Sequence, residues 1–500
     1  MSGRAERRAE AKDARARGSR DERSQPRQGP RREGRRVKPG GTSRERSGFP
    51  ALDETVPHPA RTSLWGSFLS RDNLARALRR VEQNAGAAGI DGMRTDELRR
   101  WLHEHWPEVR ARLDAGTYRP QPVRRVTIPK SAGGTRLLGV PTALDRLIQQ
   151  ALLQVLTPVF DPCFHDHSFG FRPGRSAHQA VEAARQSIAD GAAWVVDVDL
   201  DAFFDRVQHD ALMARLARRV DDKQVLRLVR RFLRAGVMAE GIKQASEEGT
   251  PQGSPLSPLL ANVMLDDLDR ELAGRGHRFV RYADDLLVYV GSERAGQRVI
   301  ESIAQYVERR LKLRVNRKKS AVDRATKRPL LGFGFFYRDG QVKVRVDPDA
   351  RMRAKERLRK LTSRRWGVSM ERRVRELNRF TVGWTAYFAY ADTPRPFADL
   401  DEWLRRRLRQ VRWKEWKRYR TRSRNLRALG IPERAAREWA GSRKGYWRIA
   451  GSVVLNRALP NAYWNKLGLQ GFSQPYSRFR DAKRTAWCGP ACQVVWEGPG

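Results

Sequence analysis

The chain has few cysteines and no long apolar run. Its 500 residues include only 3 cysteines, Cys163, Cys488 and Cys492, which are too few for the disulfide framework of a small secreted domain. The N-terminus has no apolar signal-peptide core, and no stretch approaches the roughly 20 apolar residues that a membrane-spanning helix needs. The sequence therefore predicts a cytoplasmic location and no membrane partner.

Acidic residues are scarce relative to basic ones. The chain has 100 Lys and Arg against 57 Asp and Glu, a formal net charge of +43, with a sequence pI near 11.2. An excess of this size predicts a polyanionic partner, meaning nucleic acid. A basic protein without such a partner is the alternative, and it is disfavoured because the excess is spread over the whole chain. The length allows roughly three or four domains.

Apolar residues are almost missing from residues 1–60, which are rich in arginine, glycine, serine and proline. Such a segment cannot bury enough surface to offset the entropy lost on folding, so we predict a disordered basic N-terminal tail. Its arginine pairs at positions 31–32 and 35–36 either touch nucleic acid without specificity or have no specific role. The sequence leaves both interpretations open.

Two adjacent carboxylates stand between two apolar runs in residues 279–290, FVRYADDLLVYV. This pattern predicts a tight β-hairpin with Asp284 and Asp285 at its bend. An isolated pair of this kind is more often a polar turn, but an acidic strand at residues 195–205 offers a third carboxylate. Mg²⁺ suits such a cluster because it prefers hard oxygen ligands and leaves positions open for substrate phosphates. Two ions roughly 4 Å apart would activate a primer 3′-hydroxyl and stabilise the leaving pyrophosphate.

The tetrad from Tyr282 to Asp285 resembles the Tyr-X-Asp-Asp active-site hairpin of reverse transcriptases. The blocks around it resemble the reverse transcriptase/maturases encoded inside bacterial group II introns, over about residues 64–480. The resemblance implies an α/β right-hand polymerase, with fingers and palm on an antiparallel sheet, followed by an α-helical thumb, also called maturase domain X. The implied domains are fingers and palm at 61–345, thumb at 346–420, a DNA-binding region at 421–480 and a C-terminal tail at 481–500.

The resemblance implies four metal-binding residues for two Mg²⁺ ions: Asp199, Asp284, Asp285 and, through its backbone carbonyl, Leu200. The three carboxylates are also the implied catalytic residues. Alternation along a strand places Asp197 and Asp201 on the same face as Asp199, so the residue pattern alone does not choose among them. Lys319 is the implied general acid or pyrophosphate contact, and the adjacent Lys318 remains an alternative.

The same resemblance implies contacts with the incoming deoxynucleoside triphosphate, from Lys130, Arg136, Leu200, Phe204 and Gln252. Lys130 and Arg136 lie on a predicted strand–turn–strand hairpin, and arginine suits phosphate because its planar fork binds two oxygens at once. The ring of Phe204 would clash with a ribose 2′-hydroxyl and so favour deoxynucleotides. A core aromatic is the alternative role for Phe204.

The residues expected to bind primer, template or intron RNA are Arg172, Arg175, Gly332, Arg405 and Arg406. Arg172 and Arg175 border a glycine loop and are expected on template phosphates. Gly332 would let the backbone approach the primer closely. From about residue 350 the chain becomes basic, with interleaved aromatic residues that suit a nucleic-acid duplex. An ordinary basic helical bundle is the alternative.

Histidine and cysteine are too scarce near the C-terminus for the His-Asn-His endonuclease that many family members carry. The last histidine is His277, so we expect this domain to be absent. The expected protein is an RNA-directed DNA polymerase that binds its parent group II intron RNA, promotes splicing, and supports mobility by target-primed reverse transcription at a DNA target and primer. It would be nucleoid-associated when bound to DNA. A host-recruited reverse transcriptase for defence or repair, and a maturase without polymerase activity, are the alternatives.

Overall fold

A computed structural model describes residues 63–129, 135–239, 242–244, 249 and 253–485. The predicted N-terminal tail, Lys130 and Gln252 lie outside these residues, as does the chain beyond residue 485. Arg136 is described through its backbone, which lies in a strand.

Four antiparallel strands form the central sheet, in the order β6-β7-β3-β8. They are β6 (Arg278–Tyr282), β7 (Asp285–Val290), β3 (Trp194–Val198) and β8 (Ala321–Arg324). The predicted hairpin around the two aspartates is confirmed as β6 and β7. Val196 of β3 pairs with Val288 on one side and Val322 on the other. Because side chains alternate along a strand, Val196 and Val195 face opposite sides and belong to different buried clusters.

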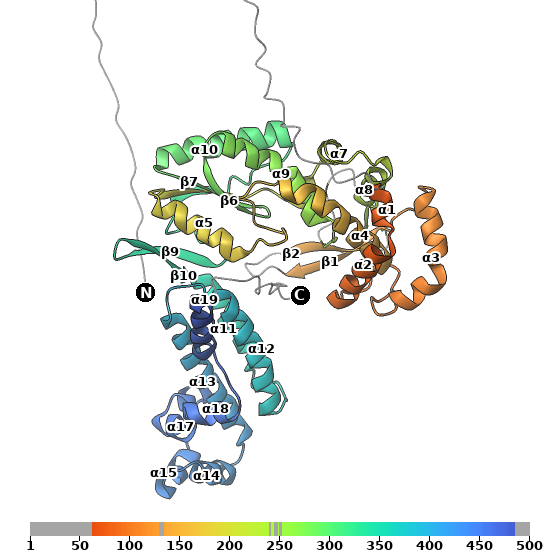
Figure 1. The fold of residues 1–500 in the computed structure, drawn as a ribbon. Coiled ribbons are helices and arrows are strands. Elements are labelled where there is room, and N and C mark those ends of the chain that lie inside the picture. The colour runs from red at the N-terminus through yellow and green to blue at the C-terminus, as the bar shows by residue number, and fades with distance from the viewer. Residues whose placement is uncertain (1–62, 130–134, 240–241, 245–248, 250–252, 486–500) are drawn as a thin grey trace, which may run out of the picture. The chain divides into compact units, whose positions relative to one another are not determined.

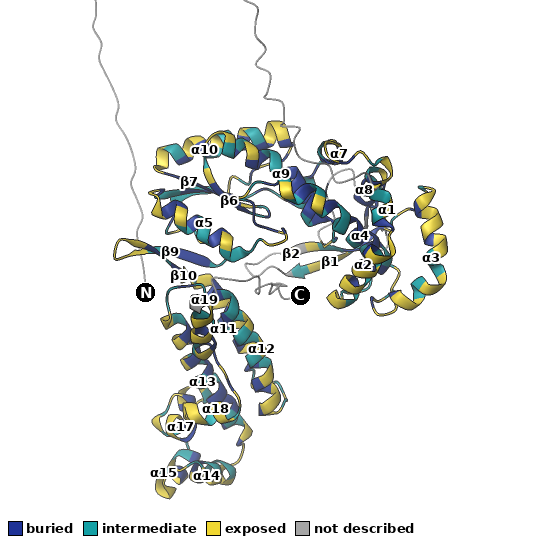
Figure 2. Ribbon diagram, in the orientation of Figure 1, coloured by how far each residue is buried: buried dark blue, intermediate teal, exposed yellow. Residues whose placement is uncertain are grey.

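Both faces of the central sheet are covered by helices (Figure 1). Helices α9 (Ser257–Gly274) and α10 (Glu293–Tyr306) cover the face that carries Val196, and α5 (Ala177–Ala189) covers the other. Figure 2 shows that α9 is buried over most of its length. Helix α5 begins at a capping box, in which Ser176 and Gln179 satisfy each other's backbone amides. Strand β3, which ends just before Asp199, is therefore buried on both faces.

The N-terminal sheet has the order β2-β1-β4-β5. Its strands are β1 (Val123–Pro129), β2 (Thr135–Val140), β4 (Val237–Ala239) and β5 (Ile242–Gln244). The antiparallel β1–β2 pair is the hairpin that the sequence predicts. The neighbouring helices are α1 (Leu64–Phe68), α2 (Arg71–Asn84), α3 (Leu98–Asp114) and α4 (Ala143–Phe160). Helix α4 begins after Thr142, whose hydroxyl accepts a hydrogen bond from Asp145 N at 3.1 Å.

Shorter elements connect these layers. They are η1 (Asp161–Cys163), α6 (Phe203–Arg206), α7 (His209–Ala217), α8 (Lys223–Arg234) and η2 (Val307–Leu311). Helix α7 packs against α8 and α9, and η2 continues α10. The chain therefore leaves the central sheet after β3, makes three helices, and returns to it through α9.

The C-terminal part starts with a hairpin and continues as helices. The hairpin strands are β9 (Phe333–Arg338) and β10 (Gln341–Val346). The C-terminal helices are α11 (Pro348–Leu361), α12 (Met370–Phe388), α13 (Arg395–Glu415), α14 (Tyr419–Ala428), α15 (Glu433–Ala440), α16 (Tyr446–Ala450), α17 (Val453–Ala458), α18 (Asn461–Lys466) and α19 (Ser473–Thr485). Helix α19 returns to α12 and α13, because Asp401 of α13 accepts hydrogen bonds from Phe472 N at 2.7 Å and Ser473 N at 2.9 Å.

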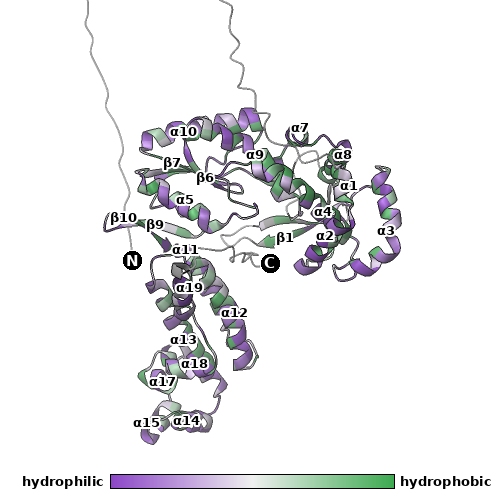
Figure 3. Ribbon diagram, viewed as in Figure 1, coloured by the Kyte–Doolittle hydropathy of each residue, from purple (hydrophilic) through white to green (hydrophobic). Residues whose placement is uncertain are grey.

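The two buried clusters divide the chain unevenly. One contains the N-terminal helices, α9, α10 and one face of the central sheet. The other runs from the opposite face of that sheet, with Val195 and Leu287, through β9 and β10 into α12, α13 and α19. The C-terminal helices therefore share a core with the sheet, while much of their outer surface is hydrophilic (Figure 3). None of the described helices has the length and apolar character needed to span a membrane.

Candidate active site

The central sheet brings the three predicted catalytic carboxylates to one end of two paired strands. Asp199 follows directly after β3, and Asp285 is the first residue of β7. Val198 pairs with Leu286, so the same register places Asp199 opposite Asp285 and on the same face. Asp284 lies in the turn between β6 and β7. The strand pairing therefore gathers these carboxylates on a rigid platform.

Negative charge is concentrated around Asp285. Asp285 is an exposed residue, but the protein around its carboxyl group displaces part of the water that would solvate it. This burial and, after it, the charges of Asp284, Asp197 and Asp199 raise the pKa of Asp285 to about 6. Burial also raises the pKa of Asp197, and Arg328, whose Nη1 lies 3.4 Å from Asp197 Oδ2, opposes that rise. Asp197, which the residue pattern left open, is thus a fourth carboxylate in the same electrostatic field.

This donor set suits a hard divalent cation. Carboxylate oxygens are the ligands that Mg²⁺ prefers, and a bound cation would remove the repulsion that raises the pKa of Asp285. In the described part of the chain, no group of three or more His, Cys, Asp or Glu side chains is already arranged to hold a metal ion. The fit is therefore one of donor chemistry and backbone position.

A second segment fixes the backbone at Asp199. The Asp199 carbonyl accepts a hydrogen bond from Asn316 N at 2.8 Å, and Leu200 pairs with Val315 in an isolated bridge. The Ser320 hydroxyl accepts a hydrogen bond from Asp199 N at 2.9 Å. Sequence reasoning missed Asn316 and Ser320 as positioning residues, although they flank the lysine pair that it singled out. The carbonyl of Leu200 as a metal ligand stays a prediction.

Lys319 lies at the carboxylate cluster. Its Nζ is 3.6 Å from Asp199 Oδ2, and its side chain is 66% exposed. This ion pair favours Lys319 over Lys318 as the residue near the reacting phosphates. The backbone amide of Lys318 instead donates to Asn316 Oδ1 at 3.2 Å and closes the local turn. The catalytic role of Lys319 stays a prediction.

Phe204 lies on α6, close to the chain that leads to Gln252. Its ring centroid is 5.2 Å from that of Phe203, and the side chain is half-buried. Gly249 abuts this helix, because a Cβ there would lie 3.0 Å from the Phe204 carbonyl oxygen. Gln252, Lys130 and the side chain of Arg136 lie outside the described residues. The four nucleotide contacts expected of these side chains therefore stay predictions.

The side chain of Arg172, which was expected on template phosphates, is engaged inside the protein. Its side chain is 5% exposed, and its guanidinium donates to Asp161 Oδ1 at 2.8 Å and to the carbonyls of His165 at 2.7 Å and Ser168 at 2.9 Å. These bonds commit Arg172 to shaping the loop that it belongs to. Arg175 is 29% exposed, so its phosphate contact stays a prediction.

Other residues singled out from the sequence also have internal contacts. Gly332 has a φ of 80°, and a Cβ there would lie 3.2 Å from the Phe388 ring, so packing against α12 already requires glycine. Arg406 lies 4.1 Å from the ring centroid of Trp447 and donates to its carbonyl at 3.2 Å. Arg405 is half-buried on the same helix. Nucleic-acid contacts of these three residues stay predictions.

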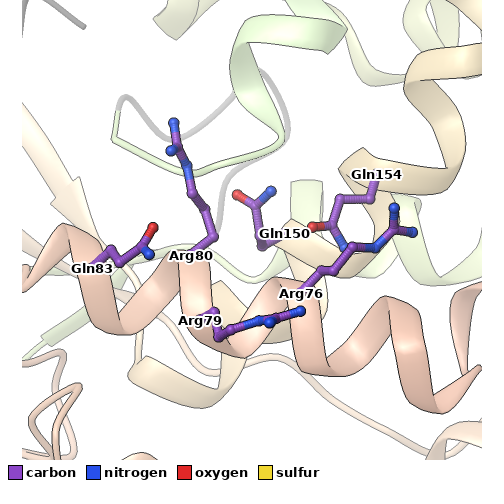
Figure 4. A pocket seen from close by; sticks show the side chains of 6 residues that line it. All are labelled: Arg76, Arg79, Arg80, Gln83, Gln150 and Gln154. Atoms are coloured by element: carbon purple, nitrogen blue, oxygen red, sulfur yellow. The ribbon is translucent and has the colours of Figure 1, made fainter.

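A cationic recess of about 450 Å³ lies between α2 and α4. It is lined by Arg76, Arg79, Arg80, Gln83, Gln150 and Gln154. Figure 4 shows the arginines along α2, with the two glutamines of α4 beside them. None of these lining residues is acidic, and guanidinium and amide groups both donate to phosphate oxygens. The recess was not predicted from the sequence, because the spacing of these arginines indicates the solvent-exposed face of an amphipathic helix.

Comparisons with known proteins agree with this arrangement. Residues 128–335 match the family described as reverse transcriptase (RNA-dependent DNA polymerase), and residues 351–430 match the group II intron, maturase-specific domain. Protein YkfC of Escherichia coli (strain K12) is 33% identical over 304 residues, which are 53% of this chain and 78% of that protein. The group II intron-encoded protein LtrA of Lactococcus lactis subsp. cremoris is 36% identical over 210 residues, 42% of this chain and 35% of LtrA.

Among solved structures, a chain of a partial Cas6-RT-Cas1–Cas2 complex matches with a TM-score of 0.33 and 23% identity, over 50% of this chain and 43% of that one. The expected fold class is confirmed by the reverse transcriptase match together with the antiparallel sheets and the helical C-terminal region. Reverse transcriptase domains generally use divalent metal ions. This chain belongs to the reverse transcriptases that carry a group II intron maturase-specific domain.

Proposed function

We propose that this RNA-directed DNA polymerase extends a DNA primer on an RNA template with deoxynucleoside triphosphates and two Mg²⁺ ions. The convergence of Asp199, Asp284 and Asp285 at the end of two paired strands carries the proposal. When bound, the ions would favour the ionised form of the primer 3′-hydroxyl and neutralise charge on the triphosphate.

The chain's own residues then have separate tasks. Asp199 and Asp284 bind the metal ions and Asp285 assists them. Lys319 pairs with Asp199 at 3.6 Å, and with a metal ion at Asp199 its ammonium group would be available to the leaving pyrophosphate. The ring of Phe204 lies beneath the sugar and excludes a 2′-hydroxyl.

We further propose that the protein binds its parent group II intron RNA, promotes splicing, and supports mobility by target-primed reverse transcription. The match to the maturase-specific domain and the similarity to LtrA support this role. The net charge of +43 supports a nucleic-acid partner. The cationic recess and the arginines of the C-terminal helices supply candidate phosphate contacts.

The domain assignment is also a proposal. The N-terminal and central sheets would be fingers and palm, within residues 61–345, and α11 to α13 would be the thumb, within 346–420. Helices α14 to α18 would form the DNA-binding region, within 421–480. Helix α19 extends from that region into residues 481–500 and packs back on α12 and α13, so its start belongs structurally with the thumb.

One experiment tests the polymerase and maturase roles together. RNA that co-purifies with the expressed protein is sequenced, and its splicing is measured at near-physiological Mg²⁺ with wild type and with Asp284→Ala. We expect both proteins to promote splicing and only wild type to extend a DNA primer on RNA. Strong extension without an enriched intron RNA would favour a host-recruited polymerase. Splicing without extension by the wild type would favour a maturase that no longer polymerises.

A further inference from the structure

Arg281 is a fully buried arginine three residues before Asp284, on strand β6. Its guanidinium has five N–H donors, and the structure gives them five acceptors. Nε and Nη2 bind the two carboxylate oxygens of Asp269 at 2.7 and 2.5 Å. Nη2 also donates to Ser168 Oγ at 2.7 Å, and Nη1 donates to Asn262 Oδ1 at 2.9 Å. The fifth acceptor is the carbonyl oxygen of Ala283, 2.9 Å from Nη1.

The bond to Ala283 falls on the peptide that carries Asp284. Ala283 has a φ of 60°, a left-handed conformation that costs a non-glycine residue roughly 1–2 kcal/mol. Such a conformation persists only where surrounding contacts impose it. Arg281 supplies one of those contacts from below the turn, because its guanidinium holds the carbonyl of Ala283 in one direction. The orientation of the Ala283–Asp284 peptide follows, and so does the direction in which the Asp284 side chain leaves the backbone.

The segment that contains Ser168 also packs against this turn. Arg281 N donates to His167 O, and Phe169 N donates to Arg281 O, each at 2.9 Å. Gly170 then lies so close that a Cβ there would collide with the backbone nitrogen of Ala283. Asn262 connects the two contacts, because its Nδ2 donates to Gly170 O at 2.9 Å while its Oδ1 accepts from Arg281. The turn is therefore clamped between this segment and α9.

We propose that Arg281 is a positioning residue for polymerisation, which holds the Ala283–Asp284 peptide in the orientation that metal binding needs. A buried ion pair gives little net stability compared with apolar residues of the same volume. The ion pair with Asp269 instead holds the Arg281 guanidinium in place, so that its bond to Ala283 fixes the orientation of the strained turn. The inference rests on the proposed metal-dependent mechanism and adds a residue that does not itself touch metal or substrate.

Two variants displace the turn by different routes. Arg281→Lys keeps a cation beside Asp269, but its single ammonium cannot also reach Ala283, Asn262 and Ser168. Gly170→Ala leaves the Arg281 side chain and its ion pair with Asp269 unchanged, and its added Cβ pushes on the backbone nitrogen of Ala283. Arg373→Lys is the matched control, because Arg373 is 1% exposed and donates to the carbonyls of Leu361 at 2.7 Å and Trp366 at 2.8 Å, both in the C-terminal region and far along the chain from the acidic turn.

The measurements are Mn²⁺ binding by electron paramagnetic resonance, and primer extension against Mg²⁺ and Mn²⁺ concentration. We expect Arg281→Lys and Gly170→Ala to raise the half-saturating metal concentration about tenfold, the lower range for loss of a group that orients a metal ligand. The rise should be larger for Mg²⁺, which demands near-ideal octahedral geometry. The kcat should fall, the KM for the triphosphate should stay unchanged, and Arg373→Lys should lower Tm without moving either metal titration.

The proposal is overturned if folded Arg281→Lys or Gly170→Ala titrates with both metals as wild type does. If Arg281→Lys does not fold, Gly170→Ala decides the question alone. A structural role for Arg281 would also follow if its variants lost affinity for Mg²⁺ and Mn²⁺ equally and in proportion to the drop in Tm, and if Arg373→Lys showed the same loss. A wild-type protein that binds Mn²⁺ but extends no primer would contradict the proposed function, while the Mn²⁺ binding data would still test Arg281.

Discussion

Two arginines, Arg281 in the central sheet and Arg364 in the C-terminal region, serve opposite purposes. In the sheet, Arg281 is buried against Asp269, and its charge is neutralised where it lies. In the C-terminal region, Arg364 lies in the turn between α11 and α12, where it is exposed, and its guanidinium carbon is 4.4 Å from the ring centroid of Tyr446. A ring face attracts a guanidinium without cancelling its charge, and the N–H groups at its edge remain able to bind phosphate.

The difference teaches how one residue type can build both a precise site and an adhesive surface. A carboxylate partner and backbone acceptors use up the donors of Arg281, so they fix geometry around the acidic turn. An aromatic partner fixes the position of Arg364 and leaves its charge for a ligand. Mutations at the acidic end of the sheet should therefore reduce polymerisation without changing RNA affinity, and mutations on the basic surface should do the reverse.

The largest expected effect tests that independence at the sheet. Asp284→Ala removes a proposed metal ligand, and we expect primer extension to fall by at least about a thousandfold, as is common when a catalytic group is lost. RNA affinity should not change, because the phosphate contacts lie elsewhere. Single-turnover extension and filter binding measure the two quantities. A parallel loss of RNA affinity would contradict the separation of the two regions.

The next effect tests the helices. Arg364→Gln should weaken RNA binding and reduce the slope of log affinity against log salt by about 1, the signature of one lost phosphate contact, with kcat unchanged. Arg395→Gln is the control, because Arg395 is exposed and lies 4.0 Å from the carboxylate of Asp399, where its charge is partly neutralised. If both variants and wild type show the same slope of log RNA affinity against log salt, the arginine stacked on Tyr446 makes no phosphate contact.

A smaller effect concerns pH. The pKa of Asp285 in the metal-free protein is about 6, above its unfolded value, so the folded state holds this proton more tightly. The resulting stability is present at low pH and is lost as pH rises from about 4 through 6. We expect Mg²⁺ to raise Tm more at pH 7.5 than at pH 5, by about 2 °C or more. In Asp285→Asn, thermal denaturation without metal should show a weaker decline over this pH range.

The smallest effect concerns the junction of α13 and α19. Asp401→Ala removes two hydrogen bonds to the backbone at the start of α19, comparable to a lost helix cap of about 1–2 kcal/mol, and should lower Tm by roughly 2–4 °C. Asp399→Ala, at an exposed position of the same helix, should leave Tm unchanged. Polymerase activity at 25 °C should be unaffected. A loss of activity without a change in Tm would show that α19 has a role beyond packing.

The sequence predicted the acidic site well, because its chemistry follows a local pattern. Apolar runs on both sides of Asp284 and Asp285 define a hairpin, and pairing between this hairpin and the strand before Asp199 follows from their shared apolar character. The prediction needed no knowledge of long-range side-chain partners. Lys319, which the family resemblance singled out, lies 3.6 Å from Asp199, because its segment pairs with the chain after β3.

Long polar side chains were predicted poorly, because their partners are chosen by the fold. Arg172 lies in a basic, glycine-containing stretch that suggests phosphate binding, yet Asp161 and nearby carbonyls bind it internally. Arg281 gave no signal at all. A single cation between Val280 and Tyr282 reads as the polar side of a strand, and its partners on α9 and near Ser168 become visible only in three dimensions.

The shared core of the central sheet and the C-terminal helices has a consequence for synthesis on the ribosome. Val195 and Leu287 face a cluster completed by residues of β9, β10 and α12, all of which are translated later. At roughly 5–20 residues per second, the part of this sheet face that α5 does not cover stays exposed for on the order of ten seconds. The α9 side can close meanwhile, since its partners are made close together. The nascent chain therefore presents an apolar sheet face as it emerges, and chaperone dependence should be greatest for truncations that end before α12.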